Sequence, residues 1–329
     1  MIAVELTAKF RNKDLLHFGT GYKDQRARAK NTWPYPPGQV LRGRFGYLLM
    51  NMQSDIVDSF KDGIPLLYFK DALVYHKKCG GLLYPTIEKQ RFLNYKCNNC
   101  NEILRYATRI STVNKTRMSR QTYKVNQLYR LQMISNYNKF RLKIIIKLKN
   151  NEKRFEDPIA IMEFARNFGL NFGGRCHKGI GKLFIEDYQL DVISDEMINQ
   201  RAEELCIKKK FKIHLLSQYI PKQNNNTNFL TVKDFLTSIK NAGKFFLYDY
   251  TNYPDPKLKL IDSQTRKPIK INFFDTNRFI SHHALPEGSQ FDFEIENAPF
   301  IFWKSLAVAE KCSGIGARTS FGKGEFIIT

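Results

Sequence analysis

Apolar and polar residues alternate in short segments along the chain, and two long stretches repeat the same order of segments. Residues 140–144 and 291–295 both alternate with a period of two, which is typical of strands. Each is followed by an apolar run that begins directly after a proline, as helices often do: residues 159–168 in the first stretch and 300–309 in the second. A glycine-rich segment and a short apolar segment come next in both. The repeated order predicts an internal duplication.

The glycine-rich segments are residues 174–185 and 317–328, and they align so that an arginine, two glycines and a final isoleucine occupy equivalent positions in both. Glycine has no Cβ atom, so it can adopt positive φ angles and let a phosphate or a base approach the main chain. A neighbouring arginine suits phosphate. A single copy is more often a tight turn, but two copies behind the same helix favour RNA contact. The predicted RNA-binding residues are Gly174, Arg175, Gly179 and Gly181 in the first copy, and Arg318, Gly322 and Gly324 in the second.

The remaining pattern fits two β-α-β-β-α-β units. Residues 1–10 alternate as a first strand, and residues 40–50 predict a helix. In the second half a helix is expected over residues 231–241, capped by Thr231, and a strand over 245–249. This is the ferredoxin-like plan, an α+β fold whose open sheet often binds RNA. We therefore expect tandem ferredoxin-like (RRM-like) domains over residues 1–195 and 196–329.

The net charge of the chain indicates a polyanionic partner. The 329 residues include 53 Lys and Arg against 31 Asp and Glu, a net charge of +22, and hydrophobic residues make up 43% of the chain. Such an excess attracts nucleic acid, although a solvated basic face is the plainer alternative. No apolar run approaches the roughly 20 residues that span a bilayer, and residues 1–5 do not begin a signal peptide. The sequence therefore predicts a cytoplasmic protein without a membrane partner.

Two short motifs predict a metal site. His76 and Cys79 are separated by two residues, and so are Cys97 and Cys100 further along. Each pair forms a tight turn that points both donors at one ion, and the distance between the pairs is typical of a zinc ribbon. In a reducing cytoplasm, clustered cysteines indicate metal rather than disulfides. We expect a structural Zn²⁺ held by these four residues, in a ribbon inserted at about residues 74–104. The alternative is three reduced cysteines beside a surface histidine.

Further basic residues predict contacts with RNA phosphates. Residues 105–130 interleave arginines and lysines, among them Arg109 and Arg117, with tyrosines. Cations follow phosphates while aromatic rings stack on bases, so this composition suits single-stranded RNA, although a charged hairpin without a ligand is also open. Arg42 and Arg44 lie in the first turns of the helix expected over residues 40–50.

Taken in order, several of these segments resemble the RAMP superfamily of CRISPR-associated proteins, which are single or tandem ferredoxin-like domains with glycine-rich loops. The segments are residues 16–21, 36–43, 109–129, 172–181 and 314–324. The zinc motifs and the second glycine-rich half look most like the two-domain subunit of type III antiviral effector complexes, type III-D in particular. This resemblance implies a structural subunit that binds guide RNA (crRNA), lies close to target RNA and packs against other subunits of the complex.

Three alternatives remain open at this stage. The related backbone subunits that cleave target RNA carry an aspartate before the proline-glycine segment, where this chain has Lys30 and Asn31, with Asp24 as the remaining candidate acid. A metal-independent endoribonuclease that processes precursor guide RNA would use histidine as general acid or base. Its candidates are His17, His282 and His283. A stand-alone zinc-ribbon nucleic-acid binder explains the metal motifs and the charge but leaves the duplication unexplained.

Overall fold

The computed structural model describes residues 2–19, 29–57, 66–88, 92–118, 125–147, 156–173, 180–221, 230–275 and 278–329. Helices and strands both contribute, which confirms the mixed architecture expected from the sequence. None of the helices within these residues is long and apolar enough to cross a membrane.

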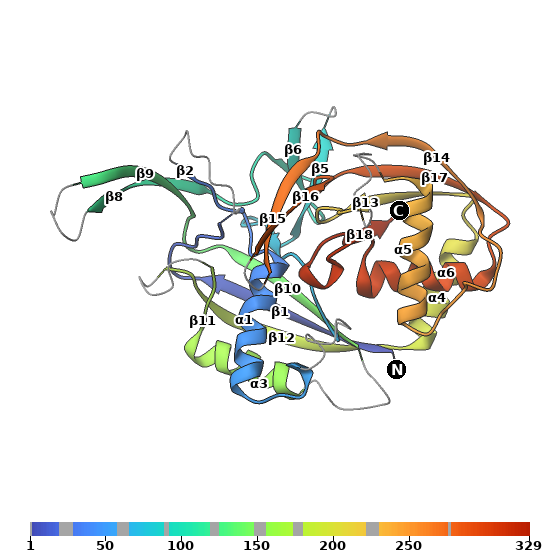
Figure 1. Ribbon diagram of the computed structural model, residues 1–329, viewed down its shortest axis with the longest axis horizontal. Coiled ribbons are helices and arrows are strands. Elements are labelled where there is room, and N and C mark those ends of the chain that lie inside the picture. Colours follow the sequence, from blue (N-terminus) through green and yellow to red (C-terminus); the bar gives the residue numbers. More distant parts are fainter. Residues whose placement is uncertain are drawn as a thin grey trace.

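A nine-stranded antiparallel sheet dominates the N-terminal half (Figure 1). Its main strands and helices follow one another as β1 (Ala3–Asn12), α1 (Gly38–Asn51), β3 (Leu67–Phe69), β10 (Lys139–Lys147), α3 (Glu156–Phe168) and β12 (Lys182–Ile193), with the short β11 (Leu170–Asn171) at the edge. In space the strands lie in the order β12-β1-β10-β3. Every second residue of β1, including Leu6 and Phe10, joins the core under α1 and α3.

Between β3 and β10 the chain adds two hairpin structures. The strands β4 (Leu73–Tyr75), β5 (Leu82–Glu88), β6 (Phe92–Cys97) and β7 (Ile103–Leu104) continue the main sheet outward from β10. The strands β8 (Ile110–Met118) and β9 (Val125–Ile134) form an arm that projects from the body, with β2 (Ala29–Lys30) paired to β9 (Figure 1). Strand β4 pairs with the first residues of β10, and β9 leads directly into β10, so both structures lie beside the start of β10.

The C-terminal half has a four-stranded sheet in the order β14-β17-β13-β18. In chain order its elements are α4 (Asp195–Cys206), β13 (Lys210–Leu215), α5 (Val232–Phe245), β14 (Lys257–Gln264), the hairpin β15 (Ile269–Asp275) and β16 (Arg278–Ala284), β17 (Gln290–Glu296), α6 (Phe300–Val308), a π-helical turn η2 (Ala309–Ser313), η3 (Thr319–Phe321) and β18 (Phe326–Ile328). This order matches the order of the main strands in the first sheet: β14 corresponds to β3, β17 to β10, β13 to β1 and β18 to β12.

Two expectations for the second half have clear outcomes. Thr231 is the N-cap of α5, and its hydroxyl accepts a hydrogen bond from the Asp234 N–H at 3.1 Å, as predicted. The strand expected over residues 245–249 is wrong, because α5 continues to Phe245 and the chain then turns. Phe246 is buried beside the helix, so its apolar side chain belongs to the end of α5 rather than to a strand.

The two halves share a hydrophobic core. The cluster built around α5 and α6 also contains Ala3, Tyr68 and Ile145, which belong to the N-terminal sheet. The ring of Tyr68 lies 5.8 Å from that of Phe245 and 5.9 Å from that of Phe246. The helical side of the second half therefore packs against one end of the first sheet, on the face opposite α1 and α3.

Candidate metal centre and nucleic-acid interface

The four predicted metal ligands lie at the tips of two adjacent turns. One turn follows β4 and carries His76 and Cys79, and the other follows β6 and carries Cys97 and Cys100. Their ligand atoms all lie within 4.8 Å of one another. The Sγ atom of Cys79 is 3.3 Å from that of Cys97 and 3.6 Å from that of Cys100, and Nδ1 of His76 is 3.2 Å from Sγ of Cys79. This cluster can hold a metal ion.

The donor set and its position fit the expected role. Three thiols and one imidazole suit a tetrahedral ion, and four protein ligands would fill its coordination sphere, as in structural sites. The turns belong to the segment of strands β4 to β7 at the outer edge of the sheet. A metal ion bound here would hold the two turns together at the outer edge of the sheet.

Groups around the cluster orient its ligands. The Oε2 atom of Glu102 is 3.7 Å from Nε2 of His76, the ring nitrogen that faces away from the sulfurs. The Nζ atom of Lys78 donates to Oε1 of the same carboxylate at 2.8 Å. A carboxylate behind a ligating histidine fixes the tautomer and direction of the ring. Glu102 is therefore a positioning residue for His76.

Main-chain groups complete the turn. Burial raises the pKa of Cys97, but its sulfur accepts hydrogen bonds from the backbone N–H groups of Cys100 and Asn99, and these lower the pKa to about 6. A Cβ atom on Gly81 would lie 2.7 Å from Sγ of Cys97, so only glycine fits here. N–H groups aimed at a thiolate are what a metal-binding cysteine turn requires, since they stabilise the charged form of the sulfur.

A second cluster forms where the two halves meet. Arg42 of α1 places its guanidinium 4.5 Å from the centre of the Phe321 ring, and Arg318 lies 5.4 Å from the same ring. The centre of the Phe273 ring in β15 lies 5.5 Å from the guanidinium carbon of Arg318. The ring centres of Phe273 and of His282 in β16 are 5.6 Å apart. Three residues predicted separately, Arg42, Arg318 and His282, are thereby brought together.

The electrostatics of this cluster favour an anion. Burial lowers the pKa of Arg42, and the positive charge of Arg318 lowers it further, to about 10. Burial and Arg318 also lower the pKa of His282. Within the described part of the chain, the Nε2 atom of His282 is buried without a hydrogen-bond partner. A phosphate beside this cluster would offset the repulsion between the two guanidinium groups and suit their planar geometry.

Arg44 lies apart from this cluster, although the sequence analysis grouped it with Arg42. Two residues along a helix differ by about 200° in direction, so the side chains leave α1 on different sides. Arg44 lies 5.4 Å from the Tyr47 ring instead.

The glycines of the second copy are packed inside the protein. A Cβ atom on Gly322 would lie 2.7 Å from Oδ1 of Asp71, and one on Gly324 would lie 1.7 Å from the carbonyl oxygen of Ile315. Both glycines are buried and have positive φ angles, 86° and 71°. Their lack of a side chain is thus required by contacts within the chain, whereas Arg318 at the same loop reaches the cluster with Arg42.

Sequence reasoning missed the polar network that holds this loop. The Nζ atom of Lys323 donates to Oδ2 of Asp71 at 2.8 Å and to Oε1 of Gln218 at 2.7 Å. The amide of Gln218 donates in turn to Tyr35 at 2.8 Å and to Glu287 at 2.5 Å. One signal was present in the sequence. When the two glycine-rich segments are aligned, Lys323 lies opposite Ile180, and a charged residue in place of an apolar one indicates a polar partner.

The other predicted residues are placed as follows. His17 is buried, and its Nδ1 atom lies 2.8 Å from the carbonyl oxygen of Gln132 in β9. His283 is exposed on β16, and Gly181 packs its backbone against Phe172. Arg109 is exposed just before β8, and Arg117 lies within β8. Asp24, Gly174, Arg175 and Gly179 lie outside the described residues.

The solved structures that the chain resembles include CRISPR-associated proteins, the group that its sequence motifs also resemble. One is a chain of the type III-B Cmr-beta complex bound to cognate target RNA and AMPPnP, with 16% identity, coverage of 88% of this chain and 86% of that chain, and a TM-score of 0.49. Another is a Cas6 product complex, with 9% identity, coverage of 100% of both chains and a TM-score of 0.49. No family model and no curated protein matches the chain.

Proposed function

We propose that this protein is a guide-RNA-binding structural subunit of a type III CRISPR interference complex. The observation that carries the proposal is the convergence of Arg42 and Arg318, from the two halves of the chain, on the ring of Phe321. Two arginine side chains that converge on one ring can neutralise phosphates, and a net charge of +22 attracts a polyanion. The order of the sequence motifs supplies the link to the type III subunit.

The architecture of the proposed subunit is a pair of ferredoxin-like domains, residues 1–195 and 196–329. The equivalent strand orders β12-β1-β10-β3 and β18-β13-β17-β14 support this division. The ion at His76, Cys79, Cys97 and Cys100 is structural Zn²⁺, because a set of three thiolates and one imidazole selects zinc among the common divalent ions. Guide RNA, target RNA and the other subunits are the partners.

Replacing Arg42 and Arg318 together by alanine is expected to weaken guide-RNA binding by roughly 10²- to 10⁴-fold, since each partly buried charge-assisted contact contributes about 1.5–3 kcal/mol. Losing two phosphate contacts on single-stranded RNA should also reduce the slope of log K against log salt by about 1.4. Fluorescence anisotropy of a labelled guide RNA over a salt series measures both quantities. The matched control is Lys257→Ala with Lys259→Ala, which removes the same charge from exposed positions of β14. An unchanged salt slope in the arginine variant would refute the role of this cluster.

Two glycines inside α1 are further evidence that RNA contacts the surface around Arg42. Gly43 and Gly46 lie in the helix interior, and a Cβ atom at either position would meet no atom within 4 Å. Glycine costs roughly 0.5–1 kcal/mol in a helix interior, and nothing within the described chain requires it here. Close approach of an RNA backbone to α1 is a reason for these residues.

Gly43→Ala is therefore expected to raise the free energy of unfolding by roughly 0.5–1 kcal/mol while weakening guide-RNA binding several-fold. Urea unfolding and anisotropy on the same sample separate the two effects. Gly38→Ala is the contrasting variant in the same helix, because its Cβ atom would lie 2.5 Å from the carbonyl oxygen of Phe69 and should destabilise the protein. If Gly43→Ala stabilises the chain and leaves binding unchanged, α1 does not face the RNA.

A second candidate function is metal-independent cleavage of precursor guide RNA. The observation that favours it is His282, whose buried Nε2 atom has no partner within the described residues and lies in the arginine cluster. An unprotonated imidazole beside a bound phosphate can act as a general base on a 2′-hydroxyl. Incubating the protein with labelled repeat RNA in EDTA decides between the candidates. A single cut that His282→Ala abolishes would make the chain a processing enzyme, and intact RNA with tight binding supports the structural subunit.

A further inference from the structure

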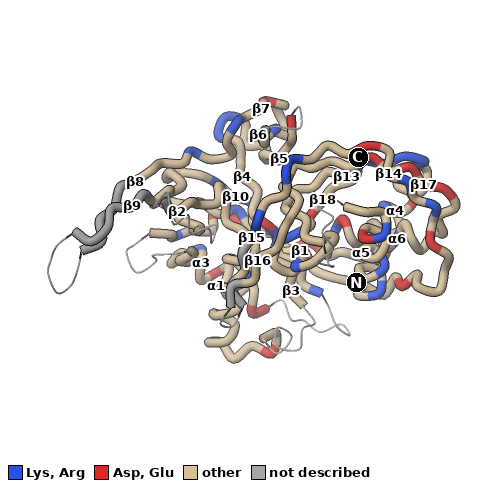
Figure 2. Tube along the Cα trace, turned by 45° about the horizontal axis from the view of Figure 1, so that its top comes forward, with Lys and Arg blue, Asp and Glu red and all other residues tan. Residues whose placement is uncertain are grey.

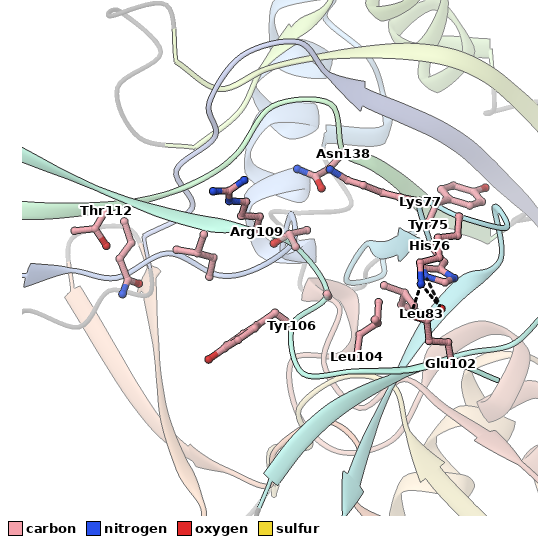
Figure 3. Close-up of a pocket in the computed structure, with 15 residues that line it drawn as sticks. Tyr75, His76, Lys77, Leu83, Glu102, Leu104, Tyr106, Arg109, Thr112 and Asn138 are labelled. Atoms are coloured by element: carbon pink, nitrogen blue, oxygen red, sulfur yellow. Dashed lines mark hydrogen bonds and ion pairs between the residues drawn. The ribbon is translucent and has the colours of Figure 1, made fainter. Parts of the chain in front are cut away.

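A groove of about 690 Å³ lies beside the metal cluster, away from the arginine cluster described above. One part of its lining is the turn after β4, another is the segment that leads into β8, and a third is the turn before β10 (Figure 3). Figure 3 shows Arg109, Asn138 and Lys77 along one side and Tyr106 and Leu104 along the other. Three separate parts of the chain thus converge on one open cavity.

The groove carries fixed positive charge. Lys77 and Arg109 are both exposed, and neither makes an ion pair with any other residue in the described part of the chain. Lys78, the next residue in the same turn, is held by Glu102. Tyr106 adds an aromatic ring that is 64% exposed and lies 5.5 Å from the guanidinium of Arg105. Cations beside an open aromatic ring suit a phosphate with its attached base.

Asn138 supplies a polar group to this lining. The residue is 1% exposed, and its amide nitrogen donates to the carbonyl oxygen of Ser135 at 2.7 Å, which fixes the direction of the amide. Its Oδ1 atom is buried and has no hydrogen-bond partner within the described residues. A buried acceptor without a donor costs about 1–3 kcal/mol, so such an atom is a candidate for a ligand contact.

We infer that this groove is a second RNA site, which binds a single-stranded segment through its phosphates at Lys77 and Arg109, with Tyr106 stacking on a base. The hydrogen-bond donor to Asn138 is a 2′-hydroxyl or a base amino group. The inference rests on the proposed RNA-binding function and adds a site to it. Because Lys77 lies between the ligands His76 and Cys79, a metal bound there would also set the position of one phosphate contact.

The test uses the full chain loaded with zinc and a labelled single-stranded RNA of mixed sequence. Lys77→Ala with Arg109→Ala is expected to weaken binding roughly tenfold and to reduce the salt slope by about 1.4, because two exposed phosphate contacts are lost. Lys257→Ala with Lys259→Ala, which lie on β14 in the other half, should leave both values unchanged (Figure 2). If the alanine pair loses metal, Lys77→Gln with Arg109→Gln replaces it. Comparing RNA with DNA of the same sequence separates the 2′-hydroxyl from the base amino group.

Each other outcome overturns the inference in a recognisable way. Unchanged binding by the groove variant, together with loss of binding in the Arg42 and Arg318 variant, removes this site and keeps the proposed function. Absence of RNA binding by the unaltered protein removes both. Displacement by an acidic peptide without any effect of the groove variant on RNA would assign the groove to a protein partner. Cross-linking of 4-thiouridine RNA to the peptide that contains Tyr106 gives an independent positive result.

Discussion

Replacing Lys323 by methionine is expected to lower the free energy of unfolding by about 3–5 kcal/mol, because the change leaves the carboxylate of Asp71 buried without its cation. The side chains of Lys323 and Asp71 are 1% and 2% exposed, and they are joined at 2.8 Å. Burial already raises the pKa of Asp71, against the opposing effect of Lys323, so the charged form depends on this partner. Urea unfolding followed by tryptophan fluorescence and by circular dichroism measures the loss.

Lys323→Met combined with Asp71→Asn is the matched control. Asparagine keeps an oxygen for the Gly38 N–H, which Asp71 now accepts at 2.7 Å, and it removes the unpaired charge. The double variant should recover more than half of the stability lost in the single one, since replacing both members of a buried pair costs less than breaking it. A loss below about 1 kcal/mol in Lys323→Met alone, the range of an exposed ion pair, would contradict the buried arrangement.

Removing the metal site is expected to have a comparable effect on the first half. Zinc that binds only the folded protein adds about 4 kcal/mol to its stability when the free ion is about 1,000-fold above its Kd. Cys97→Ser should therefore abolish the one zinc per chain that we expect in the unaltered protein, and should lower thermal stability to that of the chelated protein. Metal analysis after purification without chelator and thermal unfolding with and without zinc measure both.

Two further variants make this result specific. Cys206→Ser changes an exposed cysteine outside the cluster and should retain the metal. Glu102→Gln keeps the shape of the residue behind His76 but removes its charge, and should weaken zinc binding by roughly 10- to 100-fold without abolishing it. Protein that contains no stoichiometric zinc, with Cys97→Ser as stable as the unaltered chain, would show that the thiols are simply reduced cysteines.

The sequence was most informative where the relevant contacts are local. The spacing of His76 and Cys79, and of Cys97 and Cys100, depends on short turns, and these four residues lie together as predicted. Local periodicity also indicated the mixture of helices and strands. The strand expected at 245–249 failed because α5 buries Phe245 and Phe246 against Tyr68, a contact that spans most of the chain and leaves no local pattern.

The candidate RNA surface could be predicted only in fragments. Arg42 and Arg318 were singled out for separate reasons, and their meeting on Phe321 depends on how the two halves pack. The role of Phe273 follows from the position of the β15–β16 hairpin, which periodicity alone does not fix. The glycine motif predicted open main chain at Gly322, whereas the structure uses the absence of a side chain for contact with Asp71, since both uses impose the same residue.

The core shared between the two halves makes each half depend on the other. One half could be exchanged by recombination only if its surface matched that of the other, because Tyr68 of the first half packs against Phe246 of the second. The buried ion pair between Lys323 of the second half and Asp71 of the first links the halves in the same way. A substitution on one side of this boundary therefore alters the packing of the other half, and we expect residues along the boundary to change in pairs across related chains.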